Sequence, residues 1–236
     1  MLDRDLLETT LARWKIACGP AQVDLFAAYL AALIEWNGRM NLVAGSTLAD
    51  PTRRHLLDSL ALATALPAAP DSLVDVGSGA GLPGIPLAIL WPETRVTLIE
   101  SINKKADFLR HVAATLPLPN VSVLSERAEL VGQNRAHRER AAVVTARAVA
   151  NLATLAELCL PLCRVGGRWL APKGPDVRAE VQDAAEALRV LGAELEGAYD
   201  VLIPDEPTRS LLVFHKSRPT PADYPRQVGL PGKKPL

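Results

Sequence analysis

The stretch Leu73-Val-Asp-Val-Gly-Ser-Gly-Ala-Gly-Leu-Pro-Gly-Ile-Pro-Leu-Ala-Ile-Leu90 decides the fold of this chain. It begins with an apolar run that contains an acid, passes through a cluster of glycines and continues with apolar residues at helical spacing. The pattern predicts a strand, a loop and a helix. Glycines let the backbone turn sharply and bring its N–H groups close to a ligand, and the helix that follows offers free N–H donors at its N-terminus. We therefore predict a loop that binds a nucleotide-like ligand.

Two glycine motifs overlap in this loop. Residues Gly79–Gly84 satisfy the dinucleotide pattern G-x-G-x-x-G, whereas Asp75–Gly81 satisfy the acid-x-G-x-G-x-G pattern of methyltransferases. The dinucleotide pattern places its first glycine at the strand end, where Gly77 lies, and a count from there puts Leu82 at the third glycine's position. A carboxylate at Asp75 would also repel a pyrophosphate, but it suits a cationic ligand such as S-adenosylmethionine. The alternative is a glycine-rich turn without a ligand.

Composition sets only broad bounds on function. The chain has 236 residues, of which 49% are hydrophobic and 22% charged, so it fits one large globular domain or one domain with an appendage. Its formal net charge is zero and its pI is about 6.9. The field of the whole molecule gives no reason to expect nucleic-acid binding, so any basic surface must be local. This balance is compatible with an RNA partner as well.

The cysteines and the apolar segments indicate the cellular setting. Cys18, Cys159 and Cys163 form a sparse, odd-numbered set without Cys-x-x-Cys spacing. We expect reduced core residues and no metal site, since structural zinc usually takes four such ligands. Charged residues interrupt the start of the chain, and no stretch approaches the ~20 apolar residues that a membrane helix needs. We therefore expect a cytoplasmic protein without a leader or membrane segment.

The first part of the chain shows helical patterns and no clear strand. Apolar residues from Val23 to Ile34 recur at helical intervals, which predicts an amphipathic helix that ends near Asn37-Gly38. A second helix is predicted from Asp50-Pro51, with aspartate as its N-cap and proline at the first helical position. The proline-rich segment Leu66–Asp71 is the expected boundary with the next part.

Beyond this boundary strands and helices alternate. Such alternation predicts an α/β domain with a mainly parallel sheet that helices cover on both faces, and with ligands at the carboxyl ends of the strands. The segment Pro204–Thr208 is too short for a crossover helix, so the last two strands should form an antiparallel hairpin at the sheet edge. The predicted strands are Leu73–Val76, Arg95–Glu100, Val121–Leu124, Ala142–Ala146, Gly167–Ala171, Tyr199–Ile203 and Arg209–His215.

These patterns divide the chain into an N-terminal helical extension at residues 1–69, the α/β domain at 70–218 and a basic, proline-rich tail at 219–236. From Lys216 to the end, the sequence contains five cationic residues and one acid, Asp223. We expect the tail to be extended. A solvated terminus and a contact with phosphates explain its charge equally well.

A second acid follows the next strand. The run Thr97-Leu-Ile-Glu100 ends 19 residues after Gly81. A carboxylate at the tip of the second strand accepts hydrogen bonds from both ribose hydroxyls of an adenosyl group. Glu100 therefore supports adenosine binding for either type of cofactor. The alternative is that Glu100 caps the helix that follows.

Several motifs spread over nearly the whole chain resemble those of one family. The glycine loop alone indicates only a methyltransferase, whereas its Leu-Pro-Gly continuation, a histidine-containing helix and the tail are more specific. With these motifs the chain resembles the bacterial 16S ribosomal RNA guanine-N7 methyltransferases, also called the glucose-inhibited division protein B family. The motifs are Met40-Asn-Leu42, Arg54-His-Leu-Leu-Asp-Ser-Leu60, Asp75–Pro86, Arg127-Ala-Glu129, Ala146-Arg-Ala148, Lys173-Gly174, Tyr224-Pro-Arg226 and Pro231-Gly-Lys-Lys-Pro-Leu236.

The resemblance implies a Rossmann-like class I methyltransferase fold with a seven-stranded sheet and an N-terminal helical extension. It also implies S-adenosylmethionine as the methyl donor and, as the acceptor, one guanine in the decoding region of 16S ribosomal RNA. Glu129 is expected to act mainly through its backbone. The implied cofactor contacts are Gly77, Gly79 and Leu82 in the first loop, Glu100 at the ribose, Ala128 and Glu129 beside the adenine, and Arg147 after the fourth strand.

The implied chemistry limits which catalytic residues to expect. Guanine N7 carries an in-plane lone pair and attacks a sulfonium methyl without losing a proton, so no general base is needed. The protein must hold N7 in line, and it can donate hydrogen bonds or positive charge to guanine O6. Arg147 and Lys173 are the candidates because each follows a strand. The alternatives are a salt bridge from Arg147 to the methionyl carboxylate, and a surface position before a turn for Lys173.

Two further groups of residues have open roles. His55 and Asp58 are three residues apart and so share a helical face. They belong either to an RNA-facing wall with Arg53 and Arg54, or to an internal hydrogen-bonded pair, which the leucine-rich surroundings favour. The basic cluster at residues 135–140 belongs to a solvated loop or to an RNA site, and RNA binding would be strongly salt-dependent.

The partners expected from the resemblance are 16S ribosomal RNA or the small ribosomal subunit, including an assembly intermediate, and the chain is expected to be a monomer that does not bind membranes. The second hypothesis is a methyltransferase that acts on a small molecule or a protein. The third is a regulator that binds adenosylmethionine without catalysis. A nicotinamide-dependent dehydrogenase is a more distant fourth.

Overall fold

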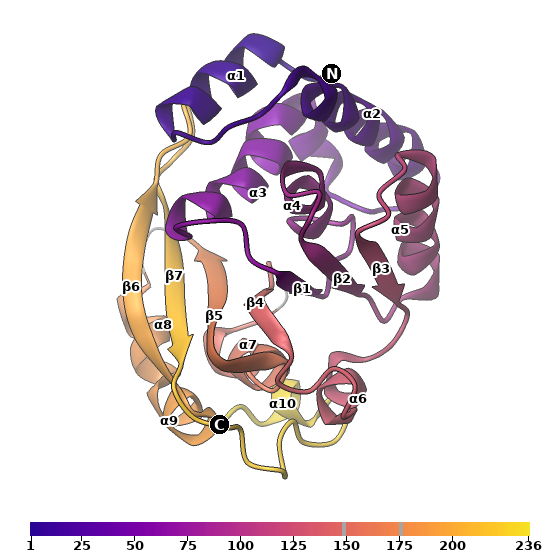
Figure 1. The fold of residues 1–236 in the computed structure, drawn as a ribbon. Helices are drawn as coiled ribbons and strands as arrows, with labels where there is room; N and C mark the ends of the chain where they lie inside the picture. The colour runs from indigo at the N-terminus through magenta and orange to yellow at the C-terminus, as the bar shows by residue number, and fades with distance from the viewer. Residues whose placement is uncertain (148–149, 175–176) are drawn as a thin grey trace.

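A computed structural model describes residues 1–147, 150–174 and 177–236 of the chain, so Ala148 of one motif lies outside the described residues. Helices lie on both faces of a central sheet (Figure 1). The strands are β1 (Ser72–Val76), β2 (Arg95–Ile99), β3 (Val121–Leu124), β4 (Ala141–Thr145), β5 (Cys163–Lys173), β6 (Ala193–Val201) and β7 (Arg209–Lys216). The helical segments are α1 (Arg4–Arg13), α2 (Pro20–Asn37), η1 (Gly45–Ala49), η2 (Thr52–Leu57), α3 (Asp58–Leu60), η3 (Ala61–Ala65), α4 (Gly84–Leu90), α5 (Asn103–Thr115), α6 (Ala128–Gln133), α7 (Leu152–Cys159), α8 (Arg178–Asp183), α9 (Ala185–Leu191) and α10 (Leu230–Lys233).

The sheet has seven strands in the order β3-β2-β1-β4-β5-β7-β6. Neighbours are parallel except at β7, which runs antiparallel to both β5 and β6. The predicted mainly parallel sheet with an antiparallel hairpin at its edge is confirmed, and β6 is the edge strand. The sequence pattern placed the start of β6 too late, because the strand begins with exposed glutamates and a register shift near Gly197, which hide its alternation.

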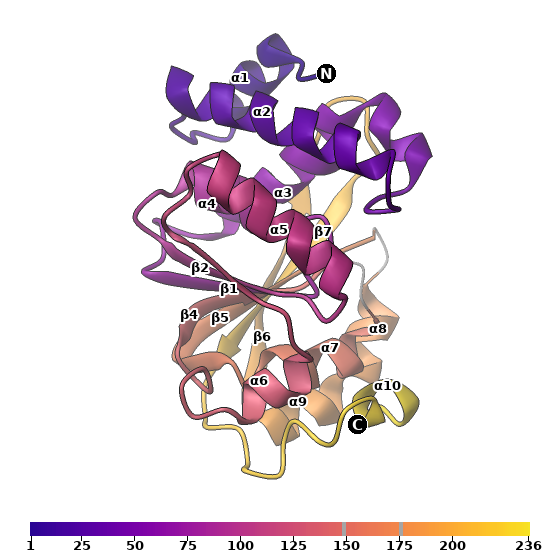
Figure 2. The same cartoon turned by 90° about the vertical axis from the view of Figure 1, so that its right-hand side faces the viewer.

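Each face of the sheet has its own hydrophobic core. The N-terminal helices α1 and α2 lie with α4 and α5 on one side, and α6, α7 and α9 lie on the other (Figure 2). Phe26, Tyr29 and Leu33 of α2 are completely buried. Trp36 at the end of α2 packs its ring 5.5 Å from that of Phe108 on α5. The helical extension therefore shares one core with the sheet, and its burial supplies much of the hydrophobic free energy on this face.

The strand register brings the ends of several strands to one edge of the sheet. Val76 is paired with Ile99, and Thr145 with both Asp75 and Leu170. The residues that follow β1, β2 and β4 therefore leave the sheet side by side. Because β7 is antiparallel, its first residues also lie at this edge, where Ser210 is paired with Lys173 of β5. Residues from both the parallel and the antiparallel part of the sheet can thus build one site.

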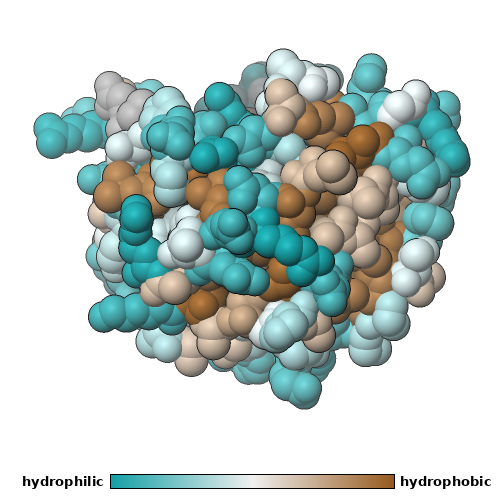
Figure 3. All heavy atoms as spheres, turned by 90° about the horizontal axis from the view of Figure 1, so that it is seen from above, coloured by the Kyte–Doolittle hydropathy of each residue, from teal (hydrophilic) through white to brown (hydrophobic). Residues whose placement is uncertain are grey.

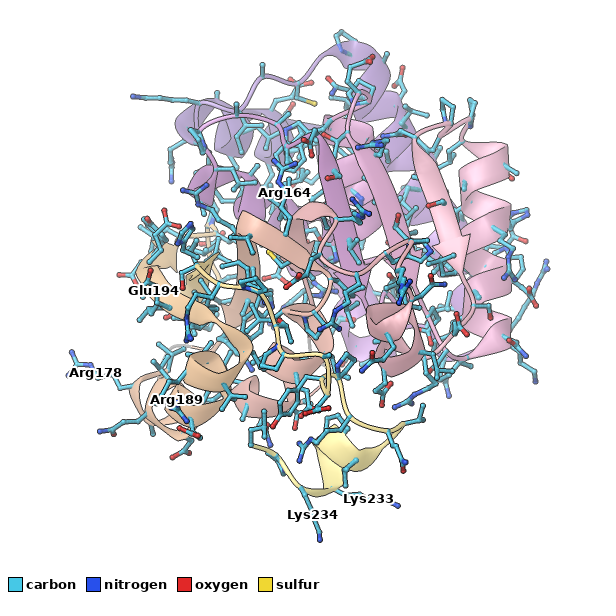
Figure 4. The ribbon with its side chains drawn as sticks, turned by 60° about the horizontal axis from the view of Figure 1, so that its bottom comes forward. Arg164, Arg178, Arg189, Glu194, Lys233 and Lys234 are labelled. Atoms are coloured by element: carbon cyan, nitrogen blue, oxygen red, sulfur yellow. The ribbon has the colours of Figure 1, made fainter. Side chains whose placement is uncertain are left out.

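The C-terminal tail packs against α6 and α7 (Figure 4). Arg226 donates through Nη2 to Glu157 Oε2 at 2.6 Å and through Nε to Oε1 at 2.9 Å, and Glu157 is fully buried. Arg138 of the basic cluster donates to four backbone carbonyls, three of them in the tail. Arg226 is therefore neither solvated nor open to phosphates, whereas Lys233 and Lys234 are exposed (Figure 4).

The surface over the N-terminal helices is mixed in character. In Figure 3, which views the molecule from this side, hydrophobic areas are broken up by hydrophilic side chains. None of the helices in the described part of the chain combines the length and apolar character needed to cross a membrane.

Replacing Arg226 tests how much the tail contributes to stability. Arg226→Ala leaves the buried Glu157 carboxylate without its cation, which should lower the free energy of unfolding by about 3–5 kcal/mol. Urea denaturation measures this loss. Arg189→Ala is the matched control, because Arg189 forms only an exposed pair with Glu186 (Figure 4) and its loss should change little. Equal unfolding midpoints for the two variants would contradict the structural role of the tail.

Candidate functional site

The glycine loop is fixed by neighbours on both sides. The N–H groups of Gly77 and Ser78 donate to the carbonyl of Ile99 at 2.8 and 3.0 Å, which joins the loop to the end of β2. The hydroxyl of Tyr29 on α2 donates to the carbonyl of Ala80 at 2.8 Å. Gly81 has a φ of +85°, and a Cβ there would come within 2.5 Å of a carbon of the Ile85 side chain. A larger residue would therefore strain this turn.

Asp75 has a different role from the predicted one. Its side chain is completely buried and does not line the cavity beside the loop. Oδ2 accepts a hydrogen bond from the N–H of Gly84 at 3.1 Å, and among the described residues Oδ1 has no partner. Burial raises the pKa of Asp75 to about 7. The acid thus holds the turn into α4, whereas the sequence analysis considered it only as a charge that suits a cationic ligand.

Glu100 joins the loop to the next helix. Oε2 accepts from the N–H of Gly79 at 2.8 Å, and Oε1 accepts from the N–H of Ile102, just before α5, also at 2.8 Å. The bond from Ile102 comes from the N-cap residue itself and not from an N–H of the first helical turn, so Glu100 does not cap α5 as the alternative predicted. Glu100 also lines the cavity beside the loop, and each carboxylate oxygen has a further lone pair. The same carboxylate can therefore hold the start of α5 beside the loop and face a ligand.

A cavity of about 460 Å³, the loop cavity, lies beside the glycine loop. The structure brings Gly77, Gly79, Leu82, Glu100 and Arg147 together in its wall. The helical extension completes the wall with residues between Leu42 and His55. All five residues were predicted from motifs far apart in the sequence.

A smaller cavity of about 70 Å³, the side cavity, adjoins the loop cavity because Gly77 and Ser101 line both. Ala128 and Glu129, which the family resemblance placed beside an adenine, lie in its wall. The Glu129 carboxylate accepts from Arg127 and from the N–H of Gly229 in the tail, at 2.8 and 2.9 Å. Because these partners hold the carboxylate, the side chain serves the packing of the tail.

On the other side, a cavity of about 510 Å³, the basic cavity, is lined by Arg54, Arg147, Lys173 and Arg209. It shares Thr47, His55 and Arg147 with the loop cavity. The side, loop and basic cavities therefore follow one another along the carboxyl edge of the sheet.

The acid Asp58 organises the basic cavity. Its side chain is 4% exposed, and its two oxygens accept from Nη1 of Arg147, at 2.6 Å, and from Nη1 of Arg209. The predicted pair between His55 and Asp58 is wrong. Residues 52–57 form a π-helix, in which the N–H of Asp58 bonds to the carbonyl of Arg53, so the three-residue spacing does not have its α-helical meaning.

His55 lies at the junction of the loop and basic cavities. Its Nε2 is 2.9 Å from Thr47 Oγ1, and that hydroxyl donates to the carbonyl of Ala44 at 2.6 Å. The hydroxyl therefore accepts from Nε2–H, which assigns Nδ1 as a hydrogen-bond acceptor. Burial, together with Arg147, lowers the pKa of His55 to about 4, so its ring is neutral near pH 7.

Lys173 lines the basic cavity, but its ammonium group has partners of its own. Nζ donates to Glu180 Oε1 at 2.6 Å and to the carbonyl of Ala150 at 3.3 Å. The side chain is only 12% exposed, so Lys173 is not a surface lysine. Its charge faces both the cavity and helix α8.

The sequence patterns missed three residues of the site: Thr47, Glu206 and Arg209. Arg54 was named only as part of a possible RNA-facing wall, and it does line the basic cavity. Glu206 lies in the loop of the predicted β6–β7 hairpin, and Arg209 is the first residue of β7. Their position at the carboxyl edge follows from the antiparallel direction of β7, so the hairpin was the signal that could have found them. Thr47 lies in a short helical segment of the extension, for which no local pattern indicates a site.

The three cysteines are free thiols, and Cys159 and Cys163 are fully buried, as predicted. Burial raises the pKa of Cys163 to about 12. Within residues 1–147, 150–174 and 177–236, no three histidine, cysteine, aspartate or glutamate side chains are grouped so as to hold a metal ion.

Solved structures share this fold at low sequence identity. The TYW2 protein of M. jannaschii, in complex with AdoMet, aligns with a TM-score of 0.55 at 13% identity, over 76% of this chain and 80% of its own. A SAM-dependent methyltransferase from Aquifex aeolicus aligns with a TM-score of 0.53 at 15% identity, over 72% of this chain and 95% of its own. The fold is that of the class I S-adenosylmethionine-dependent methyltransferases.

Sequence comparisons identify the family within this class. The family model described as rRNA small subunit methyltransferase G matches residues 22–204. A ribosomal RNA small subunit methyltransferase G of Roseiflexus sp. (strain RS-1) is 51% identical over 98% of this chain and 99% of its own length. The protein of that name in Bacillus cytotoxicus is 39% identical over 97% of both chains. The chain belongs to the rRNA small subunit methyltransferase G family and is a methyltransferase.

The buried Asp75 predicts a pH dependence of stability. The folded chain holds a proton on this acid up to about pH 7, whereas an unfolded aspartate loses it near pH 3.9. The protonated form therefore favours the fold below about pH 4, and this contribution is lost as the pH rises through 7. Asp75→Asn lacks this titration, so wild type should lose stability relative to the variant between pH 4 and 7. Urea denaturation at several pH values measures the difference, and a constant difference would refute the assignment.

Proposed function

We propose that this chain transfers a methyl group from S-adenosylmethionine to N7 of one guanine in the decoding region of 16S ribosomal RNA. One observation carries the proposal: the loop cavity and the basic cavity share Thr47, His55 and Arg147. A donor in the first cavity and an acceptor in the second would meet at these residues. The names of the relatives support ribosomal RNA as the substrate.

The residues around the loop cavity fit the cofactor. A volume of about 460 Å³ lies within the usual range of small-molecule sites. The left-handed backbone at Gly79 and Gly81 favours glycine, so no side chain at these positions fills the loop. The lone pairs that remain on Glu100 suit the ribose hydroxyls, and the side cavity with Ala128 lies where the adenine would extend. When bound, S-adenosylmethionine supplies a methyl group on a positively charged sulfur and leaves as S-adenosylhomocysteine.

The basic cavity fits a guanine held by positive charge. Guanine N7 forms the new bond with its lone pair, while the S–C bond breaks and its electron pair stays on sulfur. No proton leaves N7, so no general base is required. The neutral His55 ring donates through Nε2 to Thr47 and stands at the junction without a catalytic task as a base. Catalysis then consists of positioning and electrostatic stabilisation.

Arg147 is the first positioning candidate. Asp58 holds its Nη1 atom, and its other N–H groups make no hydrogen bond to the described residues, so they can reach guanine O6 or the methionyl carboxylate. Lys173 is the second candidate, and its ammonium group adds charge at the end of β5. Asp58 supports the site by fixing Arg147 and Arg209 rather than by contacting substrate.

Methyl transfer from labelled S-adenosylmethionine to small subunits from a strain that lacks this gene tests the function. We expect one labelled guanine, modified at N7. Parallel reactions with free 16S rRNA and with assembly intermediates identify the physiological form of the substrate. Methylation of metabolites or proteins but not RNA would establish the second hypothesis. Calorimetric binding of the cofactor without any turnover would instead indicate a regulator.

Arg147→Ala tests the positioning role. Loss of one charged hydrogen-bond donor should lower the single-turnover rate by about 10- to 100-fold at saturating cofactor. If the whole loss lies in cofactor affinity, measured by calorimetry, Arg147 binds the methionyl carboxylate instead. Arg164→Ala is a control, because Arg164 (Figure 4) forms an exposed pair with Asp71 and does not line the basic cavity, so this variant should keep the full rate.

A further inference from the structure

The basic cavity contains a buried carboxylate oxygen that lacks a hydrogen bond. Glu206, in the loop between β6 and β7, has a side chain that is 5% exposed. Its Oε1 lies 2.8 Å from Nε of Arg54. Its Oε2 has no hydrogen-bond partner in the described part of the chain, and Nη2 of Arg209, at 3.5 Å, does not meet hydrogen-bond geometry. A buried acceptor left unpaired costs stability, which is expected where a ligand supplies the donor.

The two acids of this cavity differ in their availability. Asp58 accepts hydrogen bonds from arginines at both oxygens, so it is occupied in supporting the site. Glu206 has a close arginine partner at Oε1 alone, because Arg209 approaches Oε2 only to 3.5 Å. Arg54 thus fixes its orientation and leaves the other oxygen available for a donor.

The position of Glu206 selects the part of a purine that it can reach. It lines the basic cavity but not the loop cavity, whereas His55 and Arg147 line both. Under the proposed function, guanine N7 points toward the shared residues. The N1–H and 2-amino groups lie on the opposite side of the purine and so point away from the junction, toward the part of the cavity that holds Glu206.

Given the proposed function, we propose that Glu206 determines specificity for guanine by accepting hydrogen bonds from N1–H and the 2-amino group of the target base. A carboxylate suits this edge because it only accepts, and guanine is the RNA base that presents two adjacent donors there. Adenine carries a lone pair at N1 and no 2-amino group. It would face the carboxylate with an acceptor and leave Oε2 unpaired.

The same contact favours the reaction itself. When N7 takes up the methyl group, the purine gains a positive charge, and N1–H and the 2-amino group become stronger donors. Their hydrogen bonds to Glu206 therefore tighten toward the transition state, which lowers the barrier rather than only improving binding. Because Arg54 already holds the carboxylate, little reorganisation is needed.

A two-by-two comparison of enzyme and substrate tests this inference. Small subunits are reconstituted with guanosine or inosine, which lacks the 2-amino group, at the target position. Wild type should lose about 10- to 100-fold in single-turnover rate on inosine, as expected for a hydrogen bond to a charged group. On guanosine, Glu206→Gln should be slower than wild type by a similar factor. The variant's own rates on guanosine and inosine should then differ by less than about threefold. Its affinity for S-adenosylmethionine, measured by calorimetry, should equal that of wild type.

The controls separate recognition from structural support. Asp205→Asn changes the neighbouring acid, which is 84% exposed and pairs with Arg53, and it should behave as wild type on both substrates. Arg54→Ala should slow the reaction yet keep part of the preference for guanosine, since the carboxylate remains.

Three results would overturn the inference. The first is an equal inosine effect in wild type and Glu206→Gln. The second is a full rate of the variant on guanosine, and the third is a loss of cofactor affinity that accounts for its whole defect. If wild type methylates neither guanosine nor inosine at the target position, the proposed function itself fails. That outcome differs from a failure of the Glu206 inference alone.

Discussion

The site depends on one buried carboxylate that joins three parts of the chain. Asp58 belongs to the helical extension, Arg147 follows β4 and Arg209 begins β7, and the ion pairs among them close one wall of the basic cavity. Without Asp58, two arginines in a poorly solvated wall would repel each other. The extension is therefore a structural part of the site, and it also supports the glycine loop through Tyr29.

The fold and the cofactor side could be predicted because their signals are local. A glycine loop after a strand, and an acid such as Glu100 at the next strand end, carry their meaning within a few residues, and parallel topology brings them to one edge. The acceptor side rests on contacts such as Arg209 with Asp58, 151 residues apart, which no local pattern encodes. The pairing of His55 with Asp58 was predicted wrongly for a different reason. The spacing assumed an α-helix, whereas this segment is a π-helix.

Several cationic side chains of this protein bind partners inside the fold. Although the net charge of the chain is zero, one cavity is lined by four cationic side chains, those of Arg54, Arg147, Lys173 and Arg209. Arg138 and Arg226, which the sequence placed in basic clusters, bind tail carbonyls and a buried acid instead. Cationic residues that look alike in the sequence therefore divide into those that build the fold and those that face the cavity.

The packed tail has a practical consequence for handling the protein. Leu236 packs against the second core, and the tail binds Glu129 beside the side cavity through Gly229. A purification tag fused after Leu236 would pull on a segment that touches the wall of the site. Met1, by contrast, is 99% exposed. A tag is therefore better placed before Met1, and immobilisation for binding measurements should use the same end.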